Sequence, residues 1–145
     1  MTTFEQLPKD WDQHALDDPE LLCGVVDLFA RQSDRDKGTI LALLASPDLR
    51  LLQPITIDDV PVGCDEFQQH QLVHRLCEVV SQVCPGGALA LAIARRGATV
   101  QTHWDQTWRS ALALACQDAG VTDLGCYLAT TTGTVRMDDS RVAAA

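Results

Sequence analysis

Five polar residues between positions 95 and 105 could bind a small anion. Arg95 and Arg96 follow an apolar run, and Thr102, His103 and Asp105 come shortly after them. Arginine forms paired hydrogen bonds to carboxylates and phosphates, and free N–H groups at a helix start would add to the attraction. Ligands of α/β sheets bind just outside the carboxyl ends of the strands. These residues are therefore a candidate ligand-binding crevice, although arginines that offset nearby acids and a solvated His103 are the simpler interpretation.

A second group of residues has the spacing of metal ligands on one predicted helix. His70, His74 and Cys77 are four and three residues apart, which places them in one column pointing away from the apolar stripe of that helix. Imidazole and thiolate groups at such separations can share a zinc or copper ion. A polar column is more commonly a solvated face or a subunit contact, so we expect no metal. A metal or thiol sensor, with Cys84 added, remains an alternative.

Motifs of the common catalytic sites are absent from the sequence. It contains no G-x-S-x-G elbow, no glycine-rich phosphate loop, no C-x-x-C, and no H-x-E with P-C-x-x-C. The adjacent acids Asp17-Asp18 and Asp58-Asp59 point their side chains apart, so neither pair forms an acid/base dyad by sequence. We therefore expect no catalytic residue and no cofactor.

The charge of the chain limits its partners. Eleven basic and twenty acidic residues give a net charge of −9, and the basic residues do not cluster beyond Arg95 and Arg96. Phosphate-rich surfaces are bound by clustered positive charge. Nucleic acid and membrane are therefore not expected partners, whereas a protein partner, a second copy of the chain or a small anion is.

Hydrophobicity and cysteine usage predict the location. No run approaches the roughly 20 apolar residues that span a bilayer, and the start of the chain lacks a basic segment followed by an apolar one. The six cysteines are scattered through apolar segments of a chain large enough to build its own core. We therefore expect a cytoplasmic protein whose thiols are mostly buried and reduced.

The first elements predicted along the chain are a helix and a β-hairpin. Residues 18–20 supply a capping aspartate, a proline and a glutamate, which predicts a helix over about 19–31. The apolar run 39–45 and the alternating run 49–57 are separated by the turn residues 46–48, and together they predict two antiparallel strands.

A long helix and an inner strand are predicted next. Apolar residues recur at helical spacing over 67–83 and stop at Pro85, which predicts a second helix of about 18 residues. The run Ala88–Ala94 is apolar at every position, as in a strand covered on both faces. We expect this strand at the centre of the sheet.

The last elements are a helix and two strands. Thr102 and Asp105 have the spacing of a capping box, so a third helix begins there and ends at Gly120. Strands are predicted over 124–130 and 134–137, followed by a frayed tail over 139–145. The order is α, β-β, α, β, α, β-β in a single domain of residues 1–145, an α/β fold with a mixed sheet of about five strands flanked by helices.

That order, together with residues 88–137, resembles the RadC-like branch of the JAB/MPN metallopeptidase superfamily. The resemblance covers residues 39–138 and implies layers like those of cytidine deaminases. In the family the inner strand ends in His-x-His-Pro-Ser-Gly, and a serine and an aspartate follow at the start of the next helix. The corresponding residues here are Ala92-Ile93-Ala94-Arg95-Arg96-Gly97, then Thr102 and Asp105.

The resemblance implies a fold whose metal ligands have been replaced. Gly97, Thr102 and Asp105 stand at the glycine, serine and aspartate of the family, but Ala92 and Ala94 stand at both histidines. A methyl group cannot coordinate zinc, and one carboxylate alone would hold the ion too weakly. Residues 39–63 contain no glutamate for the catalytic position. We therefore predict that metal-dependent peptidase activity is absent.

The leading interpretation is a non-catalytic RadC/MPN-like domain, a pseudoenzyme that acts through protein binding or as a homodimer. The alternative from another class is a small-anion binder or an enzyme with a rebuilt crevice at Arg95, Arg96, Thr102, His103 and Asp105. A third is the metal or thiol sensor described above.

Overall fold

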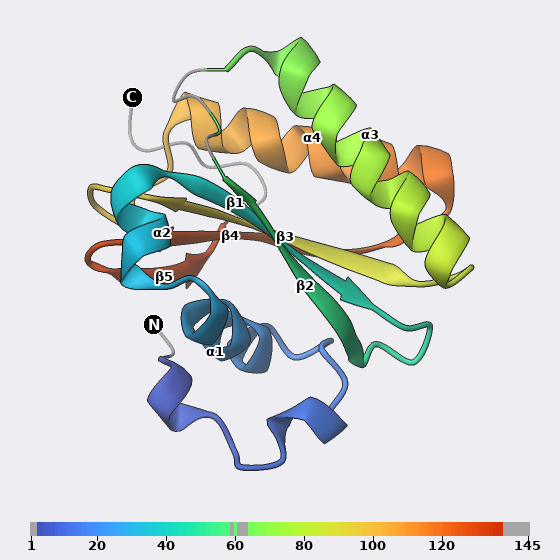
Figure 1. The fold of residues 1–145 in the computed structure, drawn as a ribbon, viewed down its shortest axis with the longest axis horizontal. Helices are drawn as coiled ribbons and strands as arrows, with labels where there is room; N and C mark the ends of the chain where they lie inside the picture. The colour runs from blue at the N-terminus through green and yellow to red at the C-terminus, as the bar shows by residue number, and fades with distance from the viewer. Residues whose placement is uncertain (1–2, 59, 61–63, 138–145) are drawn as a thin grey trace.

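A five-stranded mixed sheet organises the computed structural model, which describes residues 3–58, 60 and 64–137. The strands lie in the order β2-β1-β3-β4-β5. Helix α1 covers one face of the sheet, and helices α3 and α4 lie side by side on the other (Figure 1). The strands are β1 (Thr39–Ala45), β2 (Leu51–Asp58), β3 (Ala88–Arg95), β4 (Thr122–Thr130) and β5 (Gly133–Arg136). The helices are α1 (Pro19–Phe29), α2 (Gln32–Lys37), α3 (Glu66–Val83) and α4 (His103–Ala119).

The pairing of the strands confirms the mixed sheet flanked by helices. β1 is antiparallel to both β2 and β3, whereas β3 and β4 run parallel and are joined by α4. β4 and β5 form an antiparallel hairpin. β3 has two neighbouring strands on each side and a buried residue at every position from Ala88 to Ala94, as predicted for an inner strand.

The two faces of β3 carry side chains of different size. Leu89, Leu91 and Ile93 pack beneath α3 and α4. The intervening alanines, including Ala92 and Ala94, pack beneath α1. Because successive side chains of a strand point to opposite faces, each residue of β3 belongs to one layer only.

The helix ends follow the local capping rules. The Asp18 carboxylate accepts a hydrogen bond from the Glu20 N–H at 3.0 Å at the start of α1. Thr102 and Asp105 form the predicted capping box at the start of α4, and Gly120 ends α4 in the left-handed conformation. Helix α3 has the predicted length of 18 residues, with Asp65 as its cap.

Three sequence-based boundaries are wrong by two residues: the first helix ends earlier, β2 begins later, and β4 begins at Thr122 and not at residue 124. The first helix stops at Phe29, and residues 32–37, for which no element was predicted, form the separate helix α2. Its Arg35 is buried and bonded to neighbouring segments, so it is held by polar contacts that leave no apolar periodicity. β2 begins at Leu51 because Leu49 adopts φ +67° in the turn.

The C-terminal end of the chain was predicted to be irregular. The frayed tail predicted over 139–145 lies outside the described residues.

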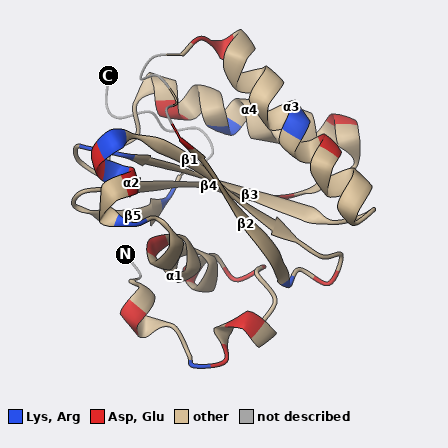
Figure 2. Ribbon diagram, viewed as in Figure 1, with Lys and Arg blue, Asp and Glu red and all other residues tan. Residues whose placement is uncertain are grey.

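Among the described residues, no helix combines the length and apolar character needed to cross a bilayer. Acidic residues are spread over the N-terminal segment and the long helices, and basic residues alternate with acidic ones in α2 (Figure 2).

Candidate functional site

Arg95 and Asp105 form a closed ion pair at the carboxyl end of β3. Arg95 Nε lies 3.1 Å from Asp105 Oδ1, and Arg95 Nη2 lies 2.7 Å from Asp105 Oδ2. The Asp105 side chain is fully buried and that of Arg95 is 16% exposed. This is the bidentate geometry in which arginine binds carboxylates most strongly. The carboxylate that the sequence placed in a ligand crevice therefore already holds a cation from the same chain.

The other donors of Arg95 fasten the loop between β3 and α4. Nη1 donates to the Arg96 carbonyl at 2.9 Å, and Nη2 donates to the Val100 carbonyl at 3.1 Å. Gly97 adopts φ +109°, and a Cβ there would lie 3.1 Å from Arg95 Nη1. Every nitrogen of the guanidinium group is thus engaged within the loop, and an external anion would have to displace these contacts.

The remaining residues of the predicted crevice do not converge with this pair on a ligand site. Thr102 Oγ1 accepts from the Asp105 N–H at 3.2 Å, and the Thr102 N–H donates to Asp105 Oδ2 at 2.8 Å. Arg96 is 74% exposed and donates to the Asp36 carbonyl of α2 at 2.9 Å. His103 is the first residue of α4, and its side chain is exposed. The structure therefore brings together Arg95, Thr102 and Asp105 and turns the other two outward.

The residues at the implied zinc position do not fit a metal centre. Ala92 and Ala94 pack under α1, whereas Asp105 belongs to α4 on the opposite face of the sheet. Zinc ligands must converge within about 2.0–2.3 Å of one ion. These three positions do not converge, and the Arg95 guanidinium takes the place beside Asp105 that a cation would need.

The predicted column of His70, His74 and Cys77 is wrong at its third member. Cys77 is completely buried between α3 and α4, with its Sγ 3.9 Å from Cys116 Sγ. Helix α3 packs against α4 as well as the sheet, so the buried arc is wider than one apolar stripe. His74 lies 3.9 Å from Asp118 on α4. In the part of the chain described, no group of three His, Cys, Asp or Glu residues could hold a metal ion.

The cysteines are free thiols within the described residues. Four of the six are buried, as expected, and the other two, Cys64 and Cys84, are partly exposed. The contact with Cys77 and burial raise the pKa of Cys116, and burial raises the pKa of Cys64. Thiols with raised pKa values remain protonated and unreactive near neutral pH. Cys77 differs, because its contact with the Cys116 thiol lowers its pKa, but its complete burial keeps reagents and metal ions away from it.

A second buried ion pair was missed by the sequence analysis. Asp27 Oδ1 accepts from Arg35 Nη2 at 2.9 Å and from Thr134 Oγ1 at 2.8 Å, and Asp27 Oδ2 accepts from the Phe4 N–H at 2.9 Å. Arg35 Nη1 also reaches the Thr130 carbonyl at 3.0 Å. Burial opposes ionisation of Asp27, but these hydrogen bonds outweigh it and lower its pKa. The pair ties α1 and α2 to the last two strands.

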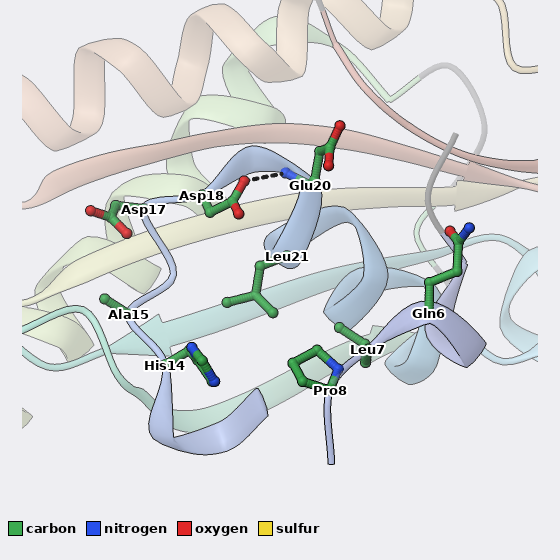
Figure 3. Close-up of a pocket in the computed structure, with 9 residues that line it drawn as sticks. All are labelled: Gln6, Leu7, Pro8, His14, Ala15, Asp17, Asp18, Glu20 and Leu21. Carbon is green, nitrogen blue, oxygen red and sulfur yellow. Dashed lines mark hydrogen bonds between the residues drawn. The ribbon is translucent and has the colours of Figure 1, made fainter. Parts of the chain in front are cut away.

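A cavity of about 740 Å³ between the N-terminal segment and α1 was also not predicted. Its floor is apolar, with Leu7, Pro8 and Leu21 beside His14 (Figure 3). The Asp18 carboxylate at its rim is already used as the helix cap. Since no described polar group is buried there without a partner, this cavity does not by itself indicate a ligand.

Comparisons with known proteins leave the family of the chain open. No family model, curated protein or solved structure matches it.

Proposed function

We propose that this chain is a non-catalytic α/β domain, related in fold to the RadC-like branch of the JAB/MPN superfamily, that acts by binding another protein. The observation that carries the proposal is the bidentate contact of Arg95 with the buried Asp105. A carboxylate that is paired with an arginine and buried is not available to hold a zinc ion or to activate a water molecule directly.

The relation to RadC-like proteins is a proposal about fold alone. The order of helices and strands, Gly97 with its positive φ, and the Thr102–Asp105 cap support it. Ala92 and Asp105 lie on opposite faces of the sheet. The chain therefore differs from a RadC-like zinc site by more than the replacement of two histidines.

A groove beside α1 supports the binding role. It has a volume of about 420 Å³ and lies between the end of α1 and the edge strand β2. Leu28, Phe29, Leu41 and Pro54 line it, with Arg31 among its polar residues. An apolar groove with a positive group can accept an apolar side chain flanked by an acidic one.

Pro54 disfavours the binding of a partner strand to the edge of the sheet. Proline lacks the N–H that sheet pairing requires, and natural proteins place it on edge strands to block extension of the sheet. β2 is such an edge and contains Pro54 in its interior. The net charge of −9 also opposes contact between two copies. We therefore favour a different protein over a homodimer.

The absence of metal chemistry is tested on the purified protein. Incubation with zinc should give no stoichiometric ion by native mass spectrometry and no hydrolysis of peptide or isopeptide bonds. Zinc bound at one equivalent, together with hydrolysis lost in Asp105→Asn, would contradict the proposal.

The binding role is tested with two matched surface variants. Leu28→Asp charges the groove, whereas Leu114→Asp changes a residue that is 50% exposed on α4. A native partner identified by cross-linking should be lost with the first variant and kept with the second. Equal retention of the partner by both would show that the groove is not the binding surface, and a dimer in sedimentation velocity that only Leu28→Asp dissociates would favour self-association.

A further inference from the structure

A buried hydroxyl group without a partner belongs to Tyr127, in the middle of β4. Tyr127 is 0% exposed, and its hydroxyl oxygen makes no hydrogen bond with any described residue. Burial raises the pKa of Tyr127, so the group is a neutral phenol that can both donate and accept. Burying such a group without a partner is unfavourable, and buried polar groups are nearly always satisfied. The hydroxyl therefore indicates a missing partner.

Tyr127 lines a cavity of about 250 Å³. This is smaller than the roughly 300–1,000 Å³ of pockets for drug-sized ligands, so an occupant would be a small molecule. Apolar side chains from three separate segments, Leu16, Leu49 and Leu124, form part of the wall. They provide a surface for an aliphatic group.

A β-bulge brings a positive charge to the same place. Leu124 and Gly125 of β4 lie opposite the single residue Ala90 of β3, and Gly125 adopts φ +99°. A Cβ on Gly125 would lie 3.5 Å from Arg136 Nε and Nη2 and 3.8 Å from the Tyr127 ring. The absent side chain thus leaves room for the Arg136 guanidinium, as bulges near binding sites commonly re-aim side chains. Arg136 forms no ion pair with a described residue.

One carboxylate borders the same cavity, that of Asp17. Asp123 is also a lining residue, but it pairs with Leu89 of β3, whose side chain faces α3 and α4, and its carboxylate accepts from the Gly125 N–H at 2.8 Å through Oδ1. The Asp17 side chain points away from Leu21 and the floor of the neighbouring N-terminal cavity (Figure 3). The small cavity therefore combines one cationic group, one anionic group, a neutral phenol and aliphatic walls.

We propose that this cavity binds a free α-amino acid with an aliphatic side chain. Its carboxylate accepts hydrogen bonds from the Tyr127 hydroxyl and Arg136, and its ammonium group faces Asp17. Its side chain packs on the leucines. A ligand with both charges suits these opposite charges better than a simple anion, which the Asp17 carboxylate would repel. The inference is independent of the protein-binding role proposed above.

The test uses four probes that differ by one chemical group each. L-leucine carries both charges and an aliphatic side chain, L-leucinamide lacks the carboxylate, N-acetyl-L-leucine lacks the ammonium group, and glycine lacks the side chain. Calorimetric titration should show one leucine bound per chain, with each of the other probes at least about tenfold weaker. Absence of leucine binding at millimolar concentration, or equal binding of leucine and either single-charge probe, would overturn the proposal.

Variants locate the site. Tyr127→Phe removes only the unpartnered oxygen, and we expect affinity for leucine to fall about tenfold. Arg136→Gln should weaken leucine by at least as much while leaving leucinamide unchanged. Arg75→Gln changes an exposed arginine on α3 and should have no effect. Circular dichroism establishes that each variant is folded, and unchanged leucine affinity in folded Tyr127→Phe and Arg136→Gln would sink this site.

Discussion

The two ends of the central parallel strands have opposite polar chemistry. At the carboxyl end of β3, the guanidinium nitrogens of Arg95 and both oxygens of Asp105 are satisfied within the chain. The cavity at the amino end of β4 is lined by Thr122 and Leu124, and also by Tyr127 from the middle of the strand, whose buried hydroxyl has no partner among the described residues. Strand ends are where α/β sheets place ligands. Here the carboxyl end of β3, where a ligand was expected, is occupied by an ion pair that holds the loop. The unpartnered hydroxyl lies beside the cavity at the opposite end.

Removing the charge of Asp105 should have the largest effect. Asp105→Asn leaves the Arg95 guanidinium at a site that is 16% exposed, without its counter-ion. Breaking a buried pair by removing one partner costs about 3–5 kcal/mol of unfolding free energy, and the partial exposure of Arg95 favours the lower part of that range. Urea denaturation measures the loss.

A double variant tests whether the loss of stability in Asp105→Asn comes from the unpaired charge of Arg95. Arg95→Met with Asp105→Asn removes both charges, so it should be more stable than Asp105→Asn alone. A loss below about 1 kcal/mol in the single variant would mean that the pair is no stronger than a surface salt bridge.

The ion pair of Asp27 with Arg35 can be compared with the Arg95–Asp105 pair through the pH dependence of its contribution to stability. Its folded-state pKa lies below the ordinary value of 3.8, so its stabilising effect is fully present above that pH. The effect is lost as the pH falls through the folded-state pKa. The wild type should therefore exceed Asp27→Asn in unfolding free energy at pH 7, and the difference should shrink steadily below about pH 4. Urea titrations across this range measure it, and a constant difference would contradict the assignment.

Gly97 tests how closely the loop is fitted around Arg95. Gly97→Ala adds strain at φ +109° and places a Cβ 3.1 Å from Arg95 Nη1. Gly38→Ala adds strain at φ +85°, where a Cβ would meet nothing within 4 Å. Backbone strain of this kind costs about 1–3 kcal/mol, so thermal unfolding should show a loss in both variants and a larger one for Gly97→Ala. Equal losses would mean that the loop yields without disturbing Arg95.

Local rules explain which elements could be predicted from the sequence. The caps at Asp18, Thr102 and Gly120 depend on residues within one turn of each helix end, and the inner strand shows itself by continuous apolar character. Helix α2 could not be found in this way, because its buried residues are the charged Asp34 and Arg35, and Arg35 has partners on other elements.

The candidate sites were harder to predict because their partners meet through tertiary structure. Arg95 and Asp105 were singled out, but nothing in their spacing of ten residues shows that they neutralise each other. Cys77 was misplaced because a second helix covers its side of α3. Tyr127, the chain's one tyrosine, lies between the apolar residues Cys126 and Leu128 of β4. That unusual position was a signal, yet its cavity is completed by Arg136, Asp17 and other distant residues.

Tyr127→Phe is expected to produce the smallest change in stability, with the opposite sign. Because the wild-type hydroxyl is buried without a partner, its removal should raise the unfolding free energy by about 0.5–1 kcal/mol when no ligand is present. Ligand reverses the order, since binding to the folded state at 100 times the dissociation constant adds about 2.7 kcal/mol. A variant with about tenfold weaker affinity gains about 1.4 kcal/mol less. Thermal unfolding with and without L-leucine should therefore show the variant more stable alone and less stable with saturating ligand. A variant that is already less stable without ligand would mean that the hydroxyl has a partner, such as an ordered water, and the contrast between the two ends of the sheet would disappear.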